Sequence, residues 1–459
     1  MNKDYKKFSI MFFVICYIFI ILFVIFIKND SVLYEEGRNA TSLPTLNIKN
    51  IKDWTGDIEN YLLDNIGYRN KMIDAVIHMK KYFGASYGSE SINIVDVENK
   101  SNYNDDFVPK SYELNETKNI TEGEVLEVSA EYDELDDIKY EVEKVGNSQN
   151  KVVVMGEGEN IRAVNIVKDL SYVVRTVPYN MNKIVDLVRQ HFGDTVKVHY
   201  MIVPMPLAYY FPESIKNLWI DQRVIIESVK EKLSDNITFV NIYDKLYEHK
   251  DEYIYFRTDS HWTQLGAYYA AEKFCEINKL PFYDLTCYEE KEIKDYCGSF
   301  YRYLEDYRFK ENPDTLIYYD PKINYTTIKK YYNLDETTNK YKINSDTSES
   351  VFKKRNDGDT YAYNVFLGGD SNTTIVKTYN NNNRKLLLVK DSFGNALAPN
   401  LLMSFSELHA VDYRYMKENL VTYIKENKIT DVLFESQMAM TTHASIQYLT
   451  LFLQDMIIK

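Results

Sequence analysis

The hydrophobic pattern of the chain from about residue 150 onward alternates between two periods. Short apolar runs rich in β-branched residues recur, and stretches whose apolar residues repeat every three or four positions lie between them. This alternation is typical of βα units that build a parallel sheet. The predicted strands are Val152–Met155, Val196–Val203, Ile237–Ile242, Lys385–Val389, Leu408–Val411 and Asp431–Glu435, and the predicted helices are Met181–His191, Ile215–Leu233, Gln264–Asn278 and Met416–Asn427.

The same patterns divide the chain into segments. We expect an α/β domain over residues 151–459, interrupted near 282–369 by an irregular insertion rich in Tyr, Asn, Asp and Lys. Residues 98–150 are acidic and lack apolar periodicity, so a solvated and partly disordered insertion is favoured over an acidic arm that binds a partner. Residues 29–97 are predicted to form a stalk and a helical segment, because apolar residues recur at helical spacing between 53 and 83.

An apolar run occupies the N-terminus. Three lysines in the first seven residues precede Phe8–Ile27, which contains no charged residue. About 20 apolar residues span a bilayer, and the lysines favour the cytoplasmic side, which would place the rest of the chain outside. A cleaved signal peptide is the alternative, but its apolar core would be shorter and a small-x-small site would follow, where this chain has Lys28-Asn29-Asp30. We therefore expect residues 1–28 to be a cytoplasmic tip and a single membrane anchor.

Charge and cysteine content narrow the class of partner. The 459 residues carry a formal net charge of -14, which repels the phosphates of nucleic acids, so nucleic-acid binding is not expected. Cys275, Cys287 and Cys297 lie beyond the apolar run; the pattern allows one disulfide among them and does not indicate which two would form it. No Cys-x-x-Cys pair is present, so a zinc site is not expected. No other metal and no cofactor is predicted.

The first motif that could carry chemistry is Asp259-Ser260-His261-Trp262-Thr263, directly before a predicted helix. Asp and His two residues apart can place a carboxylate against Nδ1 of the imidazole and leave Nε2 as a general base. Half of a metal site, a helix cap and a packed polar cluster are the competing interpretations. A metal would need further His or carboxylate ligands, and no second such cluster is evident.

The second motif is a predicted strand followed by Lys390-Asp391-Ser392-Phe393-Gly394 and a helix. A serine between a buried strand and a helix lies at the carboxyl edge of the sheet, with its backbone N–H at a helix N-terminus that would stabilise an oxyanion. Helix capping by Asp391 or Ser392 is the competing interpretation, and it is the simpler one for this motif alone. The two motifs together favour a serine nucleophile, because such a serine needs a His base and a carboxylate.

Asp-x-His-Trp-Thr followed by an apolar strand and Asp-Ser-Phe-Gly resembles the DHHW family of Firmicute envelope proteins. It is also similar to their relatives, the SGNH-hydrolase-like proteins that O-acetylate alginate, in which Asp-x-His precedes Ser. The likeness extends from Gly37-Arg38-Asn39 to Val411-Asp412-Tyr413-Arg414 and covers most of the chain. It implies an SGNH-like α/β fold, with a parallel sheet flanked by helices.

The resemblance assigns roles to individual residues. Asp259 would orient His261, His261 would be the general base, and Ser392 would be the nucleophile. Arg414 looks like the arginine that the alginate group holds near its substrate.

Two positions depart from the family pattern. Ser260 stands where the family name implies a second His, and Lys390 stands where a Gly usually precedes Asp-Ser. A lysine beside the serine could narrow the site or bind an anionic glycan. The separate oxyanion blocks of SGNH hydrolases have no clear equivalent, and Asn395 and Gln437 are the weak candidates for that role.

The predicted function is O-acetyl transfer to a cell-envelope or exopolysaccharide glycan through an acyl-enzyme on Ser392. The alginate-like resemblance implies that a multi-pass membrane acyltransferase supplies the acetyl group. Two alternatives stay open: a carbohydrate esterase, and a glycan-binding or assembly protein without catalysis.

Overall fold

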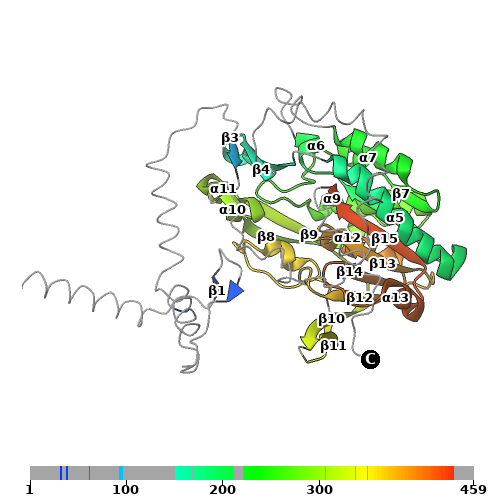
Figure 1. Ribbon diagram of the computed structural model, residues 1–459. Coiled ribbons are helices and arrows are strands. Elements are labelled where there is room, and N and C mark those ends of the chain that lie inside the picture. The colour runs from blue at the N-terminus through cyan, green and yellow to red at the C-terminus, as the bar shows by residue number, and fades with distance from the viewer. Residues whose placement is uncertain are drawn as a thin grey trace, which may run out of the picture.

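The computed structural model describes residues 150–438, apart from 168–169, 211–220, 305, 336 and 349, together with residues 32–33, 38–39, 61 and 93–96. They form a mixed α/β structure around a central eight-stranded sheet with helices on both faces (Figure 1). In spatial order the strands are β11 (Lys340–Ser348), β10 (Tyr325–Asp335), β12 (Thr373–Thr378), β14 (Glu407–Asp412), β13 (Lys385–Lys390), β15 (Asp431–Gln437), β6 (Lys197–Val203) and β7 (Ile237–Val240).

Five neighbouring strands, from β14 to β7, run parallel, and all five were predicted as strands. Their alternate side chains enter two separate cores: Leu386 and Leu388 lie in one, and Leu387 and Val389 lie in the other. Both faces are covered, which explains why these strands are apolar throughout. The first core contains residues of α9 (Gln264–Asn278) and α12 (Gly394–Leu401), and the second contains residues of α5 (Ser171–Phe192), α7 (Gln222–Lys232) and α13 (Leu420–Asn427).

The other three strands of the sheet are antiparallel, so the prediction of a purely parallel sheet was wrong for this half. β12 pairs with β14, β10 with β12, and β11 with β10, all antiparallel. Most side chains of β10 and β11 are exposed or half-buried. A strand with solvated side chains has no continuous apolar run, which is the signal that identified the parallel strands.

The segment 282–369, expected to be irregular, is largely regular. It contains a two-stranded antiparallel sheet, β10 and β11 of the central sheet, and two short helices. Its Tyr- and Lys-rich composition therefore reflects partly solvated strands. The two-stranded sheet is β8 (Tyr288–Tyr296) with β9 (Asp314–Pro321), and the helices are α10 (Ser299–Leu304) and α11 (Tyr307–Glu311).

A further sheet of three antiparallel strands contains the predicted strand Val152–Met155, which therefore does not join the parallel sheet. This small sheet is bonded to the loop that carries the first motif. Ala163 N–H donates to the Arg257 carbonyl oxygen (2.9 Å), and Arg162 Nη1 donates to the Phe256 carbonyl oxygen (3.0 Å). The strands are β3 (Asn93–Asp96), β4 (Asn150–Met155) and β5 (Arg162–Val167).

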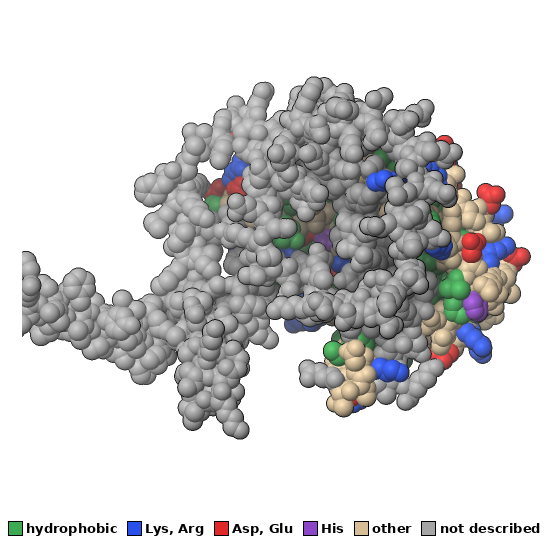
Figure 2. Space-filling model, in the orientation of Figure 1, with side chains coloured by type: hydrophobic (Ala, Val, Ile, Leu, Met, Phe, Trp, Pro, Cys, Tyr) green, Lys and Arg blue, Asp and Glu red, His purple; other side chains and the backbone are tan. Residues whose placement is uncertain are grey.

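The remaining described elements are short. On the face seen in Figure 2, acidic and basic side chains are intermixed around the end of α5, where Arg189 pairs with Asp194. This described surface is a solvated face of mixed sign. The short elements are α6 (Leu207–Tyr210), α8 (Tyr243–Glu248), and the paired strands β1 (Val32–Leu33) and β2 (Arg38–Asn39).

The predicted anchor Phe8–Ile27, nearly all of the helical pattern between 53 and 83, and the acidic segment up to residue 149 lie outside the described residues. Within the described part of the chain, no helix combines the length and apolar character needed to cross a bilayer.

Candidate active site

Ser392 lies in the tight turn between β13 and α12, at the carboxyl end of a buried strand, where the sequence places it. The Asp391 carboxylate holds this turn. Its Oδ1 accepts from Phe393 N–H (2.9 Å), and its Oδ2 accepts from the backbone N–H of Gln437 on β15 (2.7 Å). Among the described residues the backbone N–H of Ser392 has no acceptor, so it is available to an oxyanion at the start of α12.

Asp259 and His261 lie in the loop that leads into α9. Thr263 caps that helix by accepting a backbone hydrogen bond from its first turn (3.2 Å). Trp262 is fully buried, and its indole N–H donates to the carbonyl oxygen of Phe393 (2.9 Å). This bond ties the loop that carries the histidine directly to the turn that carries the serine, although 131 residues separate them in sequence.

His261 contacts both of the other predicted residues. Ser392 Oγ lies 2.8 Å from His261 Nε2, and His261 Nδ1 lies 2.6 Å from Asp259 Oδ1. The first distance lies within the range expected for a serine hydroxyl bonded to its base, about 2.6–3.2 Å. The arrangement can therefore take a proton from Ser392 at Nε2 while the carboxylate fixes the tautomer of the imidazole.

Asp259 is almost completely buried and accepts several hydrogen bonds. Its Oδ2 accepts from Ser299 N–H (2.6 Å) and the Tyr296 hydroxyl (2.8 Å), and its Oδ1 accepts from the backbone N–H of His261 (2.8 Å). Burial opposes ionisation, but the charge and hydrogen bond of the His261 side chain, the charge of Arg302 and the hydrogen bond from Ser299 N–H lower the pKa of Asp259 below its ordinary value. A Cβ on Gly298 would lie 2.1 Å from Asp259 Oδ2, so only glycine allows this approach.

Two aromatic rings flank the His261 imidazole. The Tyr363 ring is stacked on it at 3.9 Å between centroids with 16° between the planes, and the Phe393 ring lies 4.8 Å away at 43°. Tyr363 belongs to a short 3-10 helix, Ala362–Val365, and is buried. The two rings restrict the rotation of the imidazole and hold Nε2 toward Ser392.

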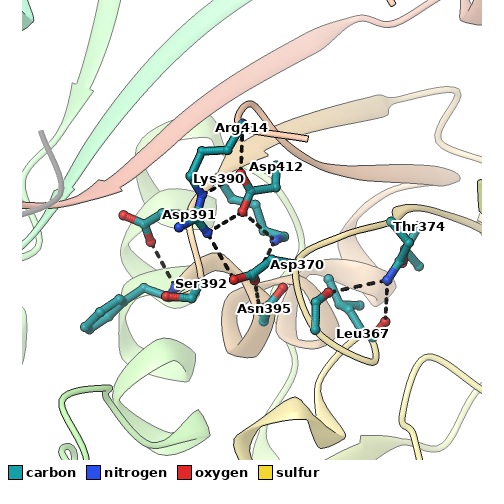
Figure 3. A network of polar contacts seen from close by, with 12 residues as sticks. Leu367, Asp370, Thr374, Lys390, Asp391, Ser392, Asn395, Asp412 and Arg414 are labelled. Carbon is teal, nitrogen blue, oxygen red and sulfur yellow. Dashed lines mark hydrogen bonds and ion pairs between the residues drawn. The ribbon is translucent and has the colours of Figure 1, made fainter. Parts of the chain in front are cut away.

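A charged cluster lies beside the serine turn (Figure 3). Lys390 is 1% exposed, and its Nζ lies 3.5 Å from Asp370 Oδ1 and 3.8 Å from Asp412 Oδ2. Arg414 Nη2 lies 2.6 Å from Asp412 Oδ2 and 3.0 Å from Asp370 Oδ2. Asn395 Nδ2 donates to Asp370 Oδ1 (2.6 Å). Two cations thus face two carboxylates in a largely buried setting.

Two further buried carboxyl groups lie under the turn. Burial raises the pKa of Asp391 to about 6. Burial, followed by the negative charge of Asp391, raises the pKa of Glu435 well above its ordinary value. The Glu435 carboxyl makes no hydrogen bond to any described residue. Both groups favour their protonated forms more than an exposed carboxyl would.

Arg414, Asn395 and Gln437, the weaker site predictions, contact other groups of the protein near the serine turn. The Arg414 guanidinium pairs with Asp412 and Asp370. Asn395 directs its amide nitrogen at Asp370, and Gln437 contacts the serine turn through its backbone N–H. Their roles toward a substrate or an oxyanion therefore stay predictions.

Ser260 and Lys390, the two departures from the family pattern, both pack against other residues of the protein. The backbone N–H of Ser260 donates to Ser299 Oγ (3.0 Å), and the two hydroxyls lie 3.2 Å apart, so Ser260 packs on Ser299. Lys390 is buried beneath the turn, where a Cβ on Gly394 would lie 2.4 Å from its own Cβ. Because Lys390 is buried and faces carboxylates, the idea that it binds an anionic glycan is wrong for this structure.

Sequence reasoning missed four contributors to the site. Tyr296, Gly298 and Tyr363 lie in the segment 282–369 that was expected to be irregular, and Asp370 directly follows it. The signals available in the sequence were glycines: Gly298 itself, in Cys297-Gly298-Ser299, and the pair that precedes Asp370, in Gly368-Gly369-Asp370. Gly368 and Gly369 have φ values of +77° and +97°, which glycine adopts readily.

The described residues contain neither a cluster that could bind a metal ion nor a disulfide. Among the described residues no three His, Cys, Asp or Glu side chains lie together in a way that could hold a metal ion. Cys275, Cys287 and Cys297 are free thiols, so the disulfide that the sequence left possible among them is not formed.

The fold and the site define an α/β protein with a Ser–His–Asp arrangement at the carboxyl edge of its sheet. Residues 80–411 match the model of the DHHW family, described as DHHW protein. The chain belongs to the DHHW family, which confirms the resemblance that the motifs indicated. No curated protein matches it.

Solved structures show the same relationship. The chain is 31% identical to a DHHW family protein from Eubacterium siraeum, with a TM-score of 0.55, over 69% of this chain and 98% of that one. It is 19% identical to PatB1 of Bacillus cereus, with a TM-score of 0.52, over 65% of this chain and 99% of that one. The PatB1 match shows a shared fold. The O-acetyltransferase domain of Pseudomonas putida AlgJ also matches, at 14% identity and a TM-score of 0.36, over 65% of this chain and 98% of that one.

Proposed function

We propose that this protein is a serine-dependent O-acetyltransferase that acts on a cell-envelope or exopolysaccharide glycan outside the cytoplasm. The observation that carries the proposal is the pair of contacts from His261, to Ser392 Oγ at 2.8 Å and to Asp259 Oδ1 at 2.6 Å. A serine and a histidine at this distance, with a buried carboxylate behind the histidine, are the parts that acyl transfer requires. The motif resemblance to the alginate-acetylating group favours a sugar hydroxyl as the acceptor.

The contacts support a two-step reaction. Ser392 Oγ attacks the acetyl carbonyl carbon while its proton passes to His261 Nε2, and the Ser392 backbone N–H stabilises the oxyanion. The donor's leaving group takes the proton from His261, which leaves an acetyl ester on Ser392. The acceptor hydroxyl then gives its proton to His261 and attacks this ester, and Ser392 recovers its proton when the bond to the acetyl group breaks.

A serine-reactive phosphonate tests the nucleophile. The protein should become labelled at Ser392, whereas Ser392→Ala should stay unlabelled with an unchanged thermal midpoint. With p-nitrophenyl acetate as donor, the acetyl group should pass to a hydroxyl of an added oligosaccharide. Release of acetate to water alone would identify an esterase instead, and absence of both labelling and turnover would favour a glycan-binding protein.

The same proposal places the protein at the membrane. The apolar run Phe8–Ile27 with its preceding lysines supports a single anchor with the bulk of the chain outside. A multi-pass membrane acyltransferase is the proposed source of the acetyl group. Protease added to intact cells should digest residues beyond the anchor, and full protection would contradict this location.

A further inference from the structure

Asp370 is the more exposed of the two carboxylates in the charged cluster. Its side chain is 19% exposed, close to the 17% of His261, whereas Asp412 is fully buried and Lys390 is 1% exposed. It follows Gly368 and Gly369, which both have positive φ values. Figure 3 shows the Asp370 carboxylate between Asn395 and Arg414, with which it interacts.

Asp370 is held rigidly as an anion. Burial opposes its ionisation, but the charges of Lys390 and Arg414, the hydrogen bond from Asn395 and the charge of His261 lower the pKa of Asp370 to about 2. Asn395, which donates to Asp370, also donates its backbone N–H to the carbonyl oxygen of Ser392 (3.2 Å), so Asp370 lies beside the serine turn. Asp370 therefore stays ionised at working pH and can only accept hydrogen bonds.

The carboxylate keeps acceptor capacity. Asn395 Nδ2 and Arg414 Nη2 occupy one position on each oxygen, at 2.6 Å and 3.0 Å. Carboxylate oxygens together offer about four acceptor positions, so the exposed edge of Asp370 can accept a further hydrogen bond. A group that fits this edge must be a donor, and in acyl transfer the natural donor beside the base is a hydroxyl.

The balance of charge decides what kind of molecule carries that hydroxyl. Lys390 and Arg414 are both paired with Asp370 and Asp412. Asp370 is more exposed (19%) than Arg414 (11%), so the most exposed charge of the cluster is a carboxylate, which repels uronate and phosphate groups placed against it. A neutral sugar meets no such penalty.

We propose that Asp370 binds a hydroxyl of a neutral glycan acceptor and positions it beside His261. This inference rests on the proposed acyl transfer. In that step the reacting sugar O–H gives its proton to His261 Nε2, the sugar oxygen bonds to the acetyl carbon, and the bond from that carbon to Ser392 Oγ breaks. Asp370 accepts a hydrogen bond from a neighbouring hydroxyl of the same sugar and thereby orients the attacking oxygen.

The test compares Asp370→Asn with Asp194→Asn in the intact protein. Asp194 is 85% exposed and precedes β6 at the opposite, amino edge of the sheet, so it controls for the same chemical change. The acetyl donor is p-nitrophenyl acetate, and the acceptors are neutral chito-oligosaccharides and oligouronates. Wild type should prefer the neutral acceptor. In Asp370→Asn the KM for the neutral acceptor should rise by about 10–100-fold, which corresponds to the loss of a hydrogen bond to a charged group. The preference of the enzyme for the neutral acceptor over oligouronates should become smaller.

The outcomes separate the two proposals. Failure of wild type to label at Ser392 or to release p-nitrophenol counts against the proposed function itself. Given wild-type turnover, an Asp370→Asn variant with unchanged acceptor KM overturns the role of Asp370. The role of Asp370 is also overturned if the variant loses its rate of Ser392 labelling to the same extent as its rate of acetyl transfer, because Asp370 would then act on the nucleophile. Should the variant not fold, a wild-type preference for oligouronates over neutral acceptors overturns the inference by itself.

Discussion

The ring of Tyr363 lies parallel to the imidazole of His261, 3.9 Å away and inclined by only 16°. The Tyr363 hydroxyl is buried and has no hydrogen-bond partner among the described residues. The ring and the hydroxyl thus have separable effects. Stacking holds the base, whereas an unpaired buried hydroxyl costs stability.

We therefore expect Tyr363→Phe and Tyr363→Leu to differ. Tyr363→Phe keeps the stack, so kcat should stay within about two-fold of wild type and the thermal midpoint should not fall. Tyr363→Leu removes the stack, so kcat should fall by about 2–10-fold at unchanged KM, in line with about 0.5–1.5 kcal/mol for an aromatic pair. Steady-state kinetics of p-nitrophenyl acetate turnover measure both. Equal kcat values for the two variants would show that the stack does not position His261.

Asp259→Asn should damage both activity and stability. All hydrogen bonds at this carboxylate are donated to it, by His261, Tyr296 and Ser299. The amide must direct its NH₂ at one of these donors, which costs about 1–3 kcal/mol. The tautomer of His261 is no longer fixed, so acylation should slow by roughly 10⁴-fold. Chemical denaturation and the rate of serine labelling measure the two effects, and wild-type labelling by a folded variant would contradict the assignment.

Lys390→Met should destabilise the fold strongly, because it leaves buried carboxylates without one of their cations. Breaking a buried ion pair from one side costs about 3–5 kcal/mol. The double variant with Asp370→Asn should lose less than the sum of the single losses, since the two groups interact directly. Lys294→Met is the matched control, because Lys294 is 60% exposed and should change stability by less than about 0.5 kcal/mol. Denaturant midpoints measure the loss of stability in each variant. If the losses of the two single variants add up to the loss of the double variant, Lys390 and Asp370 are not coupled.

Glu435→Gln should stabilise the protein, and more so as the pH rises. Burial raises the pKa of Glu435 well above its ordinary value, so the folded state keeps a proton that the unfolded state releases above about pH 4.5. Stability contributed by this proton is present below that pH and is lost as the pH rises toward the folded pKa. The difference in unfolding free energy between Glu435→Gln and wild type should therefore grow between pH 4.5 and 8. A difference that is constant over this range would mean that Glu435 is ionised in the folded protein.

Local chemistry allowed the sequence to predict the motifs of the site. An apolar strand followed by Asp391-Ser392-Phe393-Gly394 predicts a serine in a turn before a helix, and the structure has that turn. Asp259 and His261, two residues apart, predict a carboxylate against Nδ1, and their distance is 2.6 Å. The five parallel strands were also predicted, because a strand buried on both faces is apolar throughout.

The tertiary structure alone decided which distant residues complete the site. Tyr363 comes from a segment whose solvated strands lack apolar runs, and Asp370 directly follows that segment, so nothing in the pattern places these side chains at the site. The same holds for the antiparallel half of the sheet, whose pairing depends on long-range contacts between strands. The place of Lys390 was likewise undecided by the sequence: a lysine can reach solvent or pair with buried carboxylates, and the fold supplied Asp370 and Asp412 as its partners. Local sequence determines the turn and the carboxylate–imidazole pair because these contacts span a few residues, whereas the charged cluster forms only when separate strands and loops pack together.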